Sequence, residues 1–558
     1  MTQRNGGQLL VECLQALGAR HSFGVPGESY LAVLDALYDT QQSLGFTLCR
    51  NEGGAAFMAA AYGKLTGTPG ICFVTRGPGA TNASIGVHTA RQDSVPMILF
   101  VGQVGTDMKE REAFQEIDYR AFYGGVAKWA TEIEDVNRIP EFVARAWTTA
   151  ISGRPGPVVV ALPENMLTDL TDTPPLDEPL PAIQEASPSA EALEHLEAML
   201  VAAERPLILI GGGGWSEHGR GALQNFAEQT DIPLLAAFRF QDLIDNHSPC
   251  YAGDAGVGMN PTTKDLIRNA DLLFAVNVRF GEMSTDGYTL LDVPRSKQKL
   301  VHVHTSDREL GKIYVPDLAI HCGPNALSKG LSGIKAKGDW ATWRATARRD
   351  YEASLDLPDL PSPVDMGKVS AFLRDRLPDD VILTNGAGNF AVWPNKFLPL
   401  GPNQRLLAPQ SGAMGFGLPA AIAAKTAEPD RTVICFAGDG DFQMNCQELG
   451  TAMQAGTQPI VLILNNGTYG TIRMHQERHY PERVSGTNLE NPDFGALARA
   501  YGFHGERVET TGDFEAAFER AMQSDTGAVL DLAISAEALT PRQPLSAIRA
   551  AALEDKSG

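Results

Sequence analysis

Short apolar runs alternate with longer amphipathic stretches along the whole chain. Three of these runs are residues 70–75, 96–101 and 157–162, and each is apolar throughout rather than alternating with polar positions. Continuous apolar character is typical of strands that helices cover on both faces. Such strands, separated by helix-length segments, predict an α/β fold with parallel sheets.

Two segments interrupt this alternation and divide the chain into three parts of similar length. The first, at about residues 167–190, is rich in proline and acidic residues, and the second, at about 335–365, ends in a proline-rich stretch. Segments of this kind are typical of linkers. Each part has the size of an ordinary domain. We therefore predict three Rossmann-like domains with parallel sheets, spanning residues 1–170, 190–335 and 360–540.

Composition and charge exclude several classes of protein. Hydrophobic residues make up 43 % of the 558 residues and the net charge is −21, which is ordinary for a globular protein and disfavours binding to nucleic acids or anionic membranes. Seven scattered cysteines without a C-x-x-C pair indicate neither a disulfide framework nor a zinc knuckle. The chain start lacks the apolar core of a signal peptide, and no apolar run approaches the ~18 residues that span a bilayer. We expect a cytoplasmic protein.

A glycine run follows the first predicted strand of the middle part. Residues 206–210 lead into Gly211–Gly214, but the third glycine of a G-x-G-x-x-G pattern would fall on Ser216. This departure favours a tight strand-to-helix turn over a dinucleotide site. A nucleotide-binding oxidoreductase module stays as the alternative from another class of function.

The clearest chemical signal lies in the last third. Two predicted buried strands, 432–437 and 459–464, run into Gly438-Asp439-Gly440-Asp441 and Asn465-Asn466-Gly467-Thr468. Both loops should lie at the carboxyl ends of parallel strands, where α/β sheets bind ligands. Asp439 and Asn466 offer hard oxygen ligands that suit Mg²⁺ together with phosphate oxygens, and the glycines let backbone N–H groups approach phosphates. Either loop alone would indicate a polar turn, but the two loops together predict a metal–diphosphate site.

With these two loops the chain resembles the thiamine-diphosphate-dependent enzymes. Residues 47–56 are similar to the strand–glutamate–helix element of that family, in which the glutamate, here Glu52, contacts N1′ of the cofactor pyrimidine and promotes its imino tautomer. A carboxylate with this role must be shielded, because desolvation raises its pKa. The alternative for Glu52 is a carboxylate that merely faces a helix dipole. The resemblance implies thiamine diphosphate and Mg²⁺ as cofactors.

Further motifs make the chain similar to the acetolactate synthase branch over nearly its whole length. They lie at residues 75–82, 113–116, 152–158 and 412–419. The resemblance makes the three domains a pyrimidine-binding, a central and a diphosphate-binding domain. It implies these cofactor-binding residues: Glu52, Pro78, Asn82, Gly388, Asn389, Gly412, Met414, Asp439, Gly440, Asp441, Asn466, Thr468, Tyr469 and Gly470. The implied metal ligands are Asp439, Asn466 and the Thr468 carbonyl.

The implied reaction is decarboxylation of a 2-oxo acid followed by ligation to a carbonyl acceptor. A simple 2-oxo acid decarboxylase, or a C–C lyase or hydrolase on the same scaffold, stays as an alternative. The residues implied for catalysis are Glu52, Gln115, Phe114, Glu28 and His475. In the family the two ends of the cofactor lie on different subunits, so we expect a homodimer or homotetramer with the active site at the subunit interface.

Four positions depart from acetolactate synthases: Glu28 replaces a glycine, Glu164 a lysine, Met283 an arginine and His475 a tryptophan. A carboxylate on the acceptor would favour an arginine or lysine. Two lost cations and two gained carboxylates therefore predict an acceptor less anionic than a 2-oxo acid, such as an aldehyde. The alternative is that the new carboxylates face solvent or pair with Arg76 or Arg473.

The remaining expectations concern the central domain and the tail. The change in segment 279–283 argues against FAD, and ADP, coenzyme A or no ligand stay open for the central domain. His302 and His304 lie two apart on a predicted strand, and we expect surface histidines there rather than metal ligands. The stretch from about residue 540 to the end is either a lid over the site or a plain tail.

Overall fold

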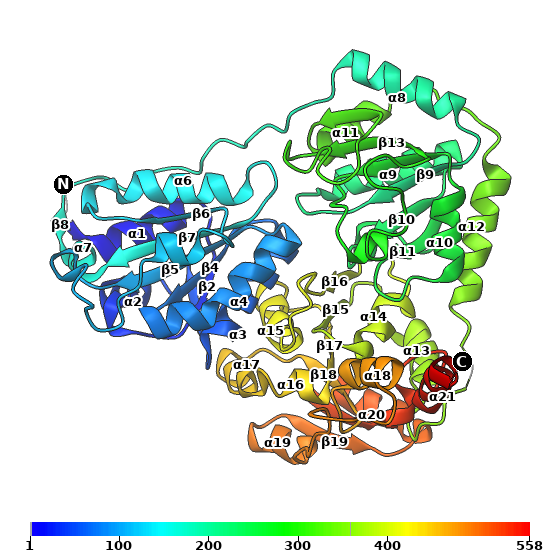
Figure 1. Cartoon of the computed structure of the whole chain (residues 1–558). Helices are drawn as coiled ribbons and strands as arrows, with labels where there is room; N and C mark the ends of the chain where they lie inside the picture. Colours follow the sequence, from blue (N-terminus) through cyan, green and yellow to red (C-terminus); the bar gives the residue numbers. More distant parts are fainter. Residues whose placement is uncertain (1–2, 358, 558) are drawn as a thin grey trace.

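The fold is described on a computed structural model that covers residues 3–357 and 359–557. Met1, Thr2 and Gly558 lie outside the described residues, as does Pro358 of the second predicted linker. Across the described ranges the strands form three six-stranded parallel sheets and one short antiparallel pair. Each third of the chain supplies one sheet, and we call these parts the first, middle and third units (Figure 1). The predicted α/β fold with parallel sheets is confirmed.

The first unit has the strand order β3-β2-β4-β5-β7-β6. Its strands are β2 (His21–Gly24), β3 (Gly45–Leu48), β4 (Gly70–Val74), β5 (Met97–Gln103), β6 (Trp129–Glu132) and β7 (Pro157–Pro163). Its helices are α1 (Gly6–Ala16), α2 (Leu31–Asp39), α3 (Glu52–Thr66), α4 (Gly77–Asp93), α5 (Tyr119–Tyr123), α6 (Ile139–Ile151) and α7 (Glu164–Thr168). The short strands β1 (Arg4–Asn5) and β8 (Leu170–Thr171) pair antiparallel. Every residue of β4, β5 and β7 is buried, as their continuous apolar sequence predicts.

The middle unit has the order β11-β10-β9-β12-β13-β14. Its strands are β9 (Pro206–Ile210), β10 (Leu234–Ala237), β11 (Tyr251–Ala255), β12 (Leu272–Val276), β13 (Lys299–His304) and β14 (Leu318–His321). Its helices are α8 (Ala190–Ala202), α9 (Glu217–Thr230), α10 (Pro261–Asn269), α11 (Pro324–Leu331) and α12 (Ala341–Ser354).

Two expectations for the middle unit were wrong. The segment 335–365 is not all linker, because α12 forms there and is anchored by two tryptophans: Trp340 Nε1 donates to the Ala203 carbonyl and Trp343 Nε1 to the Pro206 carbonyl, each at 3.0 Å. His302 and His304 are not surface residues, since each is only 2 % exposed. Their strand β13 lies inside the sheet, where polar residues are buried along with their apolar neighbours.

The third unit has the order β16-β15-β17-β18-β20-β19. Its strands are β15 (Ile382–Asn385), β16 (Arg405–Leu407), β17 (Val433–Gly438), β18 (Ile460–Asn465), β19 (His504–Val508) and β20 (Ala528–Ala533). Its helices are α13 (Met366–Arg376), α14 (Val392–Lys396), α15 (Gly417–Ala427), α16 (Asp439–Phe442), α17 (Leu449–Ala455), α18 (Gly470–His479), α19 (Phe494–Ala500), α20 (Thr511–Met522) and α21 (Leu545–Ser557).

The predicted tail is therefore largely helical, and it packs back onto the third unit. Helix α21 lies against α18 (Figure 1). The Arg549 guanidinium donates to both carboxylate oxygens of Glu477, at 2.9 and 2.8 Å. Glu477 is buried, and the hydrogen bond from Arg549 is the main reason that its pKa falls to about 2. A charge-assisted bidentate contact of this kind fixes the tail on α18.

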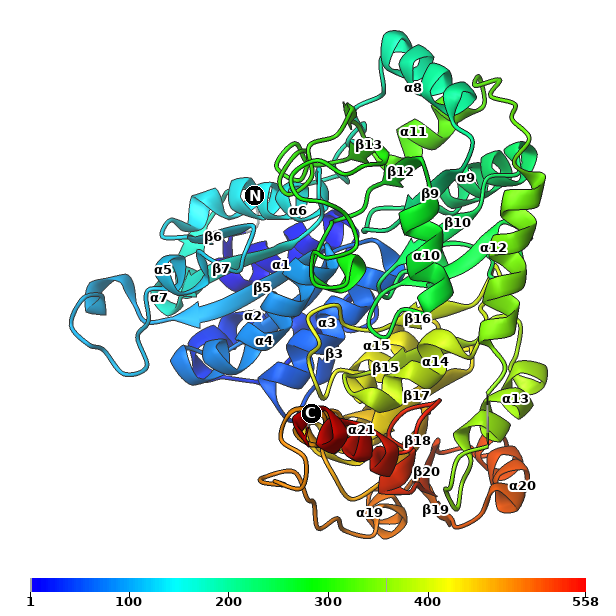
Figure 2. The ribbon, with the colours of Figure 1, turned by 45° about the vertical axis from the view of Figure 1, so that its right-hand side comes forward.

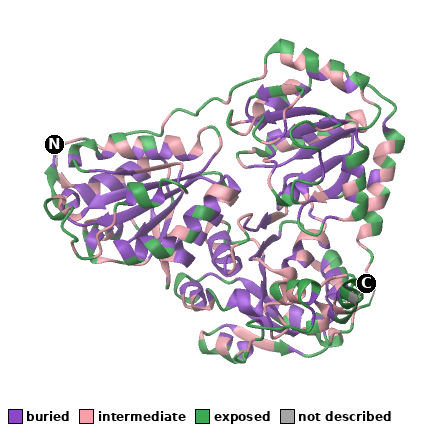
Figure 3. Cartoon of the chain, in the orientation of Figure 1, coloured by how far each residue is buried: buried purple, intermediate pink, exposed green. Residues whose placement is uncertain are grey.

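The first and third units share a continuous hydrophobic core. Helix α3 packs on α15, with Phe57 and Phe416 in edge-to-face contact at a centroid distance of 5.4 Å. Figure 2 shows α3, α15 and β16 close together where the three units meet, and Figure 3 shows buried residues concentrated on the strands. None of the helices in the described ranges is long and apolar enough to cross a membrane. All seven cysteines are described, and each is free.

Candidate active site

The predicted residues of the first unit gather at one edge of its sheet. Glu28 follows β2, Glu52 begins α3 directly after β3, and the segment from Arg76 to Asn82 follows β4. Phe114 and Gln115 follow β5, and Glu164 begins α7 after β7. Because the strands are parallel, all these positions lie at the carboxyl end of the sheet, which is where α/β proteins bind ligands.

The two carboxylate oxygens of Glu52 have different surroundings. Asn82 Nδ2 donates to Glu52 Oε2 at 2.9 Å. The other carboxylate oxygen, Oε1, lies 3.4 Å from where a Cβ on Gly79 would stand, which is van der Waals contact. Asn51 caps the helix by accepting from Gly53 N at 2.8 Å. One oxygen of Glu52 is therefore engaged, while the other lies beside a residue without a side chain.

The loop that carries Phe114 and Gln115 has a constrained backbone. Gln115 adopts a left-handed conformation with φ 66°, which costs free energy for a residue other than glycine and is typical of functional sites. The Gln115 carbonyl accepts from Gly77 N at 3.0 Å. Glu116 holds the loop by accepting from the backbone N–H of Glu110 and Ala113 at 2.7 and 3.0 Å. Phe114 is left 72 % exposed.

The new carboxylate at Glu164 pairs with Arg76. The Arg76 guanidinium forms an ion pair with Glu164 and donates to the Phe114 carbonyl at 3.4 Å. The Arg76 side chain is 10 % exposed and that of Glu164 33 %. Arg473, the second candidate partner, instead donates from Nη2 to Glu477 at 2.9 Å. Of the two alternatives for the added carboxylates, pairing holds for Glu164, whereas Glu28 is exposed.

In the third unit, the two predicted loops are tied to each other. Asp439 Oδ2 accepts from Gly467 N at 2.9 Å, and Asn466 Oδ1 accepts from Thr468 N at 3.1 Å. Asn491, which no sequence motif marks, donates from Nδ2 to Asp439 Oδ2 at 2.7 Å and to Asn465 Oδ1 at 2.9 Å. Burial raises the pKa of Asp439, and the hydrogen bond from Asn491 acts in the opposite direction.

Asp441 joins the loops that follow β15 and β16. Its Oδ1 accepts from Ala387 N at 3.1 Å and from Gly415 N at 2.9 Å. A Cβ on Gly386 would lie 2.0 Å from the same oxygen, so only glycine fits beside it. Burial raises the pKa of Asp441 to about 7, while the two backbone bonds and nearby Arg239 lower it.

The other predicted residues of this unit flank these loops. Asn389 N donates to Thr471 Oγ1 at 2.8 Å, and Asn389 Nδ2 to the Leu539 carbonyl at 3.0 Å, which links the loop after β15 to α18 and to the tail. Gly412 is exposed with φ 67°, and Met414 is half-buried. A Cβ on Gly440 would lie 2.5 Å from the Tyr469 ring.

His475 lies apart from these contacts on the surface of α18. It is exposed, and its ring lies parallel to that of His479 with centroids 6.1 Å apart. Burial lowers its pKa, and the nearby positive charge of Arg478 adds to the effect.

The donor set of the third unit fits a magnesium diphosphate. It combines one carboxylate, one amide oxygen and backbone groups, which are hard ligands. Within the described ranges, no group of three or more His, Cys, Asp or Glu side chains could hold a metal by itself. A dication at Asp439 and Asn466 therefore needs further oxygens, which phosphates supply. Only glycine fits at Gly440 and Gly388, because a Cβ there would lie within 2.8 Å of an aromatic ring.

The middle unit has a small cavity near the first unit. It has a volume of about 90 Å³ and is lined by residues that include Arg279, Tyr288, His302, Glu309 and Tyr314. Arg279 already donates to the Gln92 carbonyl at 2.6 Å, and Arg154 pairs with Glu309 at 3.1 Å. In the glycine run, a Cβ on Gly213 would lie 2.2 Å from the Ser94 carbonyl, so the run packs closely against the first unit.

Three family models match the three parts of the chain. They describe thiamine pyrophosphate enzymes: the N-terminal TPP binding domain over residues 4–122, the central domain over 193–331 and the C-terminal TPP binding domain over 386–532.

Known proteins match the chain over nearly its whole length. The chain is 32 % identical to the acetolactate synthase isozyme 2 large subunit of Escherichia coli (strain K12), over 99 % of this chain and 100 % of that protein. It is 32 % identical to the acetolactate synthase large subunit of Parasynechococcus marenigrum (strain WH8102), over 95 % of this chain and 87 % of that one. It is 29 % identical to the mitochondrial acetolactate synthase catalytic subunit of Saccharomyces cerevisiae, over 95 % and 80 %.

Proposed function

Because the chain belongs to the thiamine pyrophosphate enzymes, we propose that it decarboxylates a 2-oxo acid and joins the remaining fragment to a carbonyl acceptor. The observation that carries this proposal is the presence of two clusters, each at the carboxyl edge of a parallel sheet: Glu52 bonded to Asn82, and Asp439 bonded to the loop that carries Asn466 through Gly467 N. The whole-length similarity to acetolactate synthases supports carboligation over simple decarboxylation or hydrolysis.

The third unit would hold thiamine diphosphate through Mg²⁺. Asp439, Asn466 and the Thr468 carbonyl are the metal ligands, and the backbone around Gly388, Asn389, Gly440, Tyr469 and Gly470 meets the diphosphate. Asn491 orients the Asp439 carboxylate by donating to Oδ2, which leaves Oδ1 for the metal. When bound, this cofactor supplies a nucleophilic carbon and an electron sink for decarboxylation.

Glu52 would exchange a proton with the cofactor through one of its two carboxylate oxygens. Asn82 donates to Oε2, so that oxygen acts as an acceptor and the exchangeable proton belongs on Oε1. The neighbour of Oε1, Gly79, has no side chain, so Oε1 is the oxygen that would face the cofactor. Glu52 thus activates the cofactor by sharing a proton with it.

The remaining residues orient the reactants. Gln115 is fixed by its carbonyl bond to Gly77 and orients the substrate, while Phe114 supplies an apolar wall that keeps water out. His475 lies apart from the other site residues in one chain, and the family resemblance alone implies that it acts on the acceptor carbonyl. Because its pKa lies below that of a free histidine, it is mainly neutral at pH 7 and donates through its ring N–H.

A second copy of the chain completes the site. The hydrogen bond of Glu52 joins it to Asn82 in the first unit, and those of Asp439 join it to the third unit. Apolar side chains near both clusters are exposed: Ile85 43 %, Phe114 72 %, Met444 48 % and Ile472 55 %. Exposed apolar groups of this kind indicate an interface. We expect a homodimer or homotetramer in which Glu52 serves the cofactor bound by the partner's third unit.

The acceptor would be an aldehyde rather than a second 2-oxo acid. A carboxylate on the acceptor favours an arginine or lysine without a partner. Arg76 is already paired with Glu164, and Arg473 with Glu477. Glu28 adds an exposed negative charge at the same edge. An acceptor without a charge does not compete with Glu164 for Arg76 and is not repelled by Glu28.

FAD would be absent from the working enzyme. Arg279 and Arg154, which could bind a pyrophosphate between the first and middle units, are engaged by Gln92 and Glu309. The cavity beside them, about 90 Å³, is well below the ~300 Å³ at which pockets for small organic ligands begin. The purified protein should show no flavin absorbance band in the visible range, and a yellow protein with stoichiometric flavin would contradict this.

The proposed reaction is tested by its products. The purified protein is incubated with thiamine diphosphate, Mg²⁺ and a panel of 2-oxo acids, each with and without aldehydes, and the products are identified by mass spectrometry. A new C–C bond between donor fragment and aldehyde is the expected result. Release of the simple aldehyde from the donor alone, with no ligation product, would instead support the decarboxylase alternative.

A further inference from the structure

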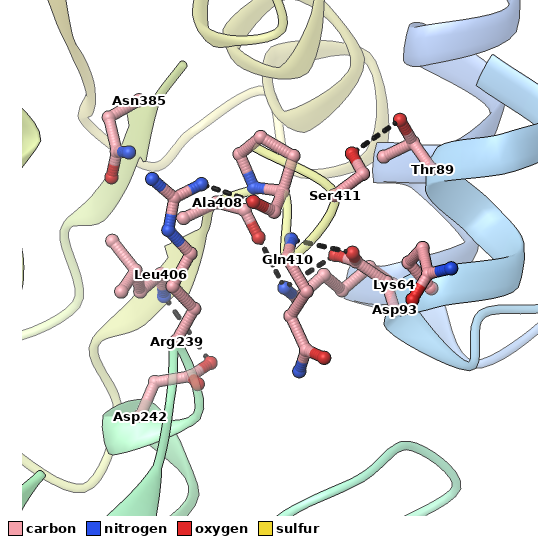
Figure 4. Close-up of polar contacts among 12 residues, drawn as sticks. Lys64, Thr89, Asp93, Arg239, Asp242, Asn385, Leu406, Ala408, Gln410 and Ser411 are labelled. Atoms are coloured by element: carbon pink, nitrogen blue, oxygen red, sulfur yellow. Dashed lines mark hydrogen bonds and ion pairs between the residues drawn. The ribbon is translucent and has the colours of Figure 1, made fainter. Parts of the chain in front are cut away.

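The segment from Ala408 to Gly415 joins β16 to α15 and carries Gly412 and Met414, two of the cofactor-binding residues that the family resemblance implies. Polar groups on both sides of residues 412–414 are bound by side chains from other parts of the chain. Figure 4 shows these contacts for the end from Ala408 to Ser411. Gly412 itself is exposed, with Ala413 and Met414 half-buried. Side chains from other parts of the chain therefore hold both ends of the segment, whereas Gly412 N bonds only within it, to the Pro409 carbonyl at 3.2 Å.

The first unit grips the leading end through an ion pair. Asp93 Oδ1 accepts from Gln410 N at 2.7 Å. Lys64 Nζ donates to Asp93 Oδ2 at 3.1 Å and to the Ala408 carbonyl at 2.8 Å. Both side chains are nearly buried, at 8 and 3 % exposure. Thr89 adds a hydroxyl contact to Ser411 at 2.9 Å.

The middle unit grips the same end from the opposite side. Arg239 donates to the Pro409 carbonyl and, at 3.1 Å, to the Gly386 carbonyl at the end of β15. It is 5 % exposed and has a left-handed backbone with φ 62°. Burial lowers its pKa to about 10, while Asp93 and Asp441 raise it. Its charge is thus compensated by carboxylates of two other units.

The trailing end is held within the third unit. Asp441 accepts from Gly415 N, and Asn445 Nδ2 donates to the Gly415 carbonyl at 2.9 Å. A Cβ on Gly415 would lie 2.8 Å from Asn445 Nδ2, and its φ is 78°. Glycine is required there both for space and for conformation.

The helices that grip the segment also carry the proposed catalytic residues. Lys64 lies in the last turn of α3, which begins at Glu52, and Asp93 is the last residue of α4, which carries Asn82. Twelve residues of helix separate Glu52 from Lys64, or about 18 Å.

We propose that Lys64, Asp93 and Arg239 are positioning residues for the cofactor: they fix the segment 408–415 so that Gly412 and Met414 stand in register with the bound pyrimidine ring. This inference rests on the proposed function. Buried ion pairs contribute little net stability. The three buried charges that contact the segment 408–415 are therefore better explained by the conformation in which they hold it. A small displacement of a group that orients a reactant is costly for catalysis.

The test compares variants of residues that hold the segment 408–415 with a variant of a matched ion pair that does not contact it. Lys64→Met removes the cation, Lys64→Arg retains it, and Thr89→Val removes only the Ser411 contact and leaves no buried charge unpaired. Glu309→Gln breaks the Arg154–Glu309 pair, which also bridges two units with both side chains nearly buried (12 and 10 % exposed) but does not touch the segment. Each protein is measured for thiamine diphosphate affinity, and its apo form for amide hydrogen exchange over residues 408–415.

Loss of a hydrogen bond to a charged group should weaken cofactor binding about tenfold in Lys64→Met and less in Thr89→Val. Exchange in 408–415 should rise in both, while Lys64→Arg and Glu309→Gln should match the wild type. Unchanged affinity in Lys64→Met and Thr89→Val, or an equal loss in Glu309→Gln, would overturn the proposal. If the wild-type protein fails to bind thiamine diphosphate, the proposed function fails. Amide hydrogen exchange in the apo protein still decides whether Lys64 and Thr89 order the segment 408–415.

Discussion

Replacing Glu164 by glutamine should shift the acceptor preference of the enzyme toward carboxylates. Glu164 is the ion-pair partner of Arg76, a residue that lies directly before the start of α4 and also contacts the Phe114 carbonyl. Glutamine has the same size as glutamate but no charge, so it leaves the guanidinium free to attract an acceptor carboxylate.

The size of the effect follows from the exposure of the pair. A hydrogen bond to a charged group contributes about 1.5–3 kcal/mol when shielded from water. The Glu164 side chain is 33 % exposed, so solvent screening reduces this to about 1–1.5 kcal/mol. That free energy corresponds to roughly a tenfold change in selectivity.

The assay is a competition between two acceptors. One 2-oxo acid serves as donor, an aldehyde and a second 2-oxo acid are supplied together, and the ratio of the two ligation products is measured. The ratio should move about tenfold toward the carboxylate-bearing product in Glu164→Gln. Glu141→Gln, which breaks the surface pair with Arg138 on α6, serves as the control and should leave the ratio unchanged.

An unchanged ratio in a folded and active Glu164→Gln enzyme would refute the reasoning, because it would mean that Arg76 does not face the acceptor. A wild-type enzyme that already prefers the 2-oxo acid would refute the proposed acceptor class itself.

Four further outcomes are expected. Removing Mg²⁺ with a chelator should release thiamine diphosphate reversibly, and Asn491→Ala should weaken Mg²⁺-dependent cofactor binding about 10–100-fold, because Asn491 orients the Asp439 carboxylate; equal affinity in the variant would count against this role. The buried His304, whose pKa burial lowers to about 3, stays neutral in the folded protein while the unfolded chain takes up a proton below pH ~6.5. Stability should therefore fall as the pH drops, by about 2 kcal/mol between pH 7 and 5 for this residue, and denaturant titrations of His304→Asn should show a smaller fall. Glu477→Gln should weaken the hold of Arg549 on the tail and increase amide exchange in α21, whereas the surface variant Glu141→Gln should not.

The placement of Asp439, Asn466 and Glu52 at the carboxyl edges of two sheets could be predicted from the sequence because its signals are local. Asp439 and Asn466 each follow directly on a buried apolar strand, and parallel strands bring such positions to one edge. Glu52 was marked in the same way, by a strand before it and small residues after it. The bonds from Gly467 N to Asp439 and from Asn82 to Glu52 then follow from the fold.

The supporting residues could not be predicted, because their contacts are distant in the chain. Asn491 reaches Asp439 from 52 residues away and has no motif around it. Asp93 meets Gln410 across 317 residues, and Arg239 meets Pro409 across 170. Apolar periodicity carries no information about which buried charge will meet which backbone group.

The two wrong expectations, a linker over 335–365 and surface positions for His302 and His304, also depend on contacts between distant parts of the chain. The proline-rich end of the segment 335–365 led to the linker prediction and hid α12, which Trp340 and Trp343 tie to the Ala203 and Pro206 carbonyls. His302 and His304 were expected at the surface because they are polar. The interior position of β13 buries them, and His302 Nε2 lies 3.0 Å from the Val278 carbonyl.

The central claim, that Glu52 activates thiamine diphosphate for decarboxylation, is tested most directly by CO₂ release from 2-oxo acids by the wild-type enzyme and by Glu52→Gln. The account predicts release that requires both thiamine diphosphate and Mg²⁺ and that is lost in the variant, although the variant still binds the cofactor through Asp439 and Asn466. Release that continues undiminished in Glu52→Gln, or that proceeds without the cofactor, would contradict it.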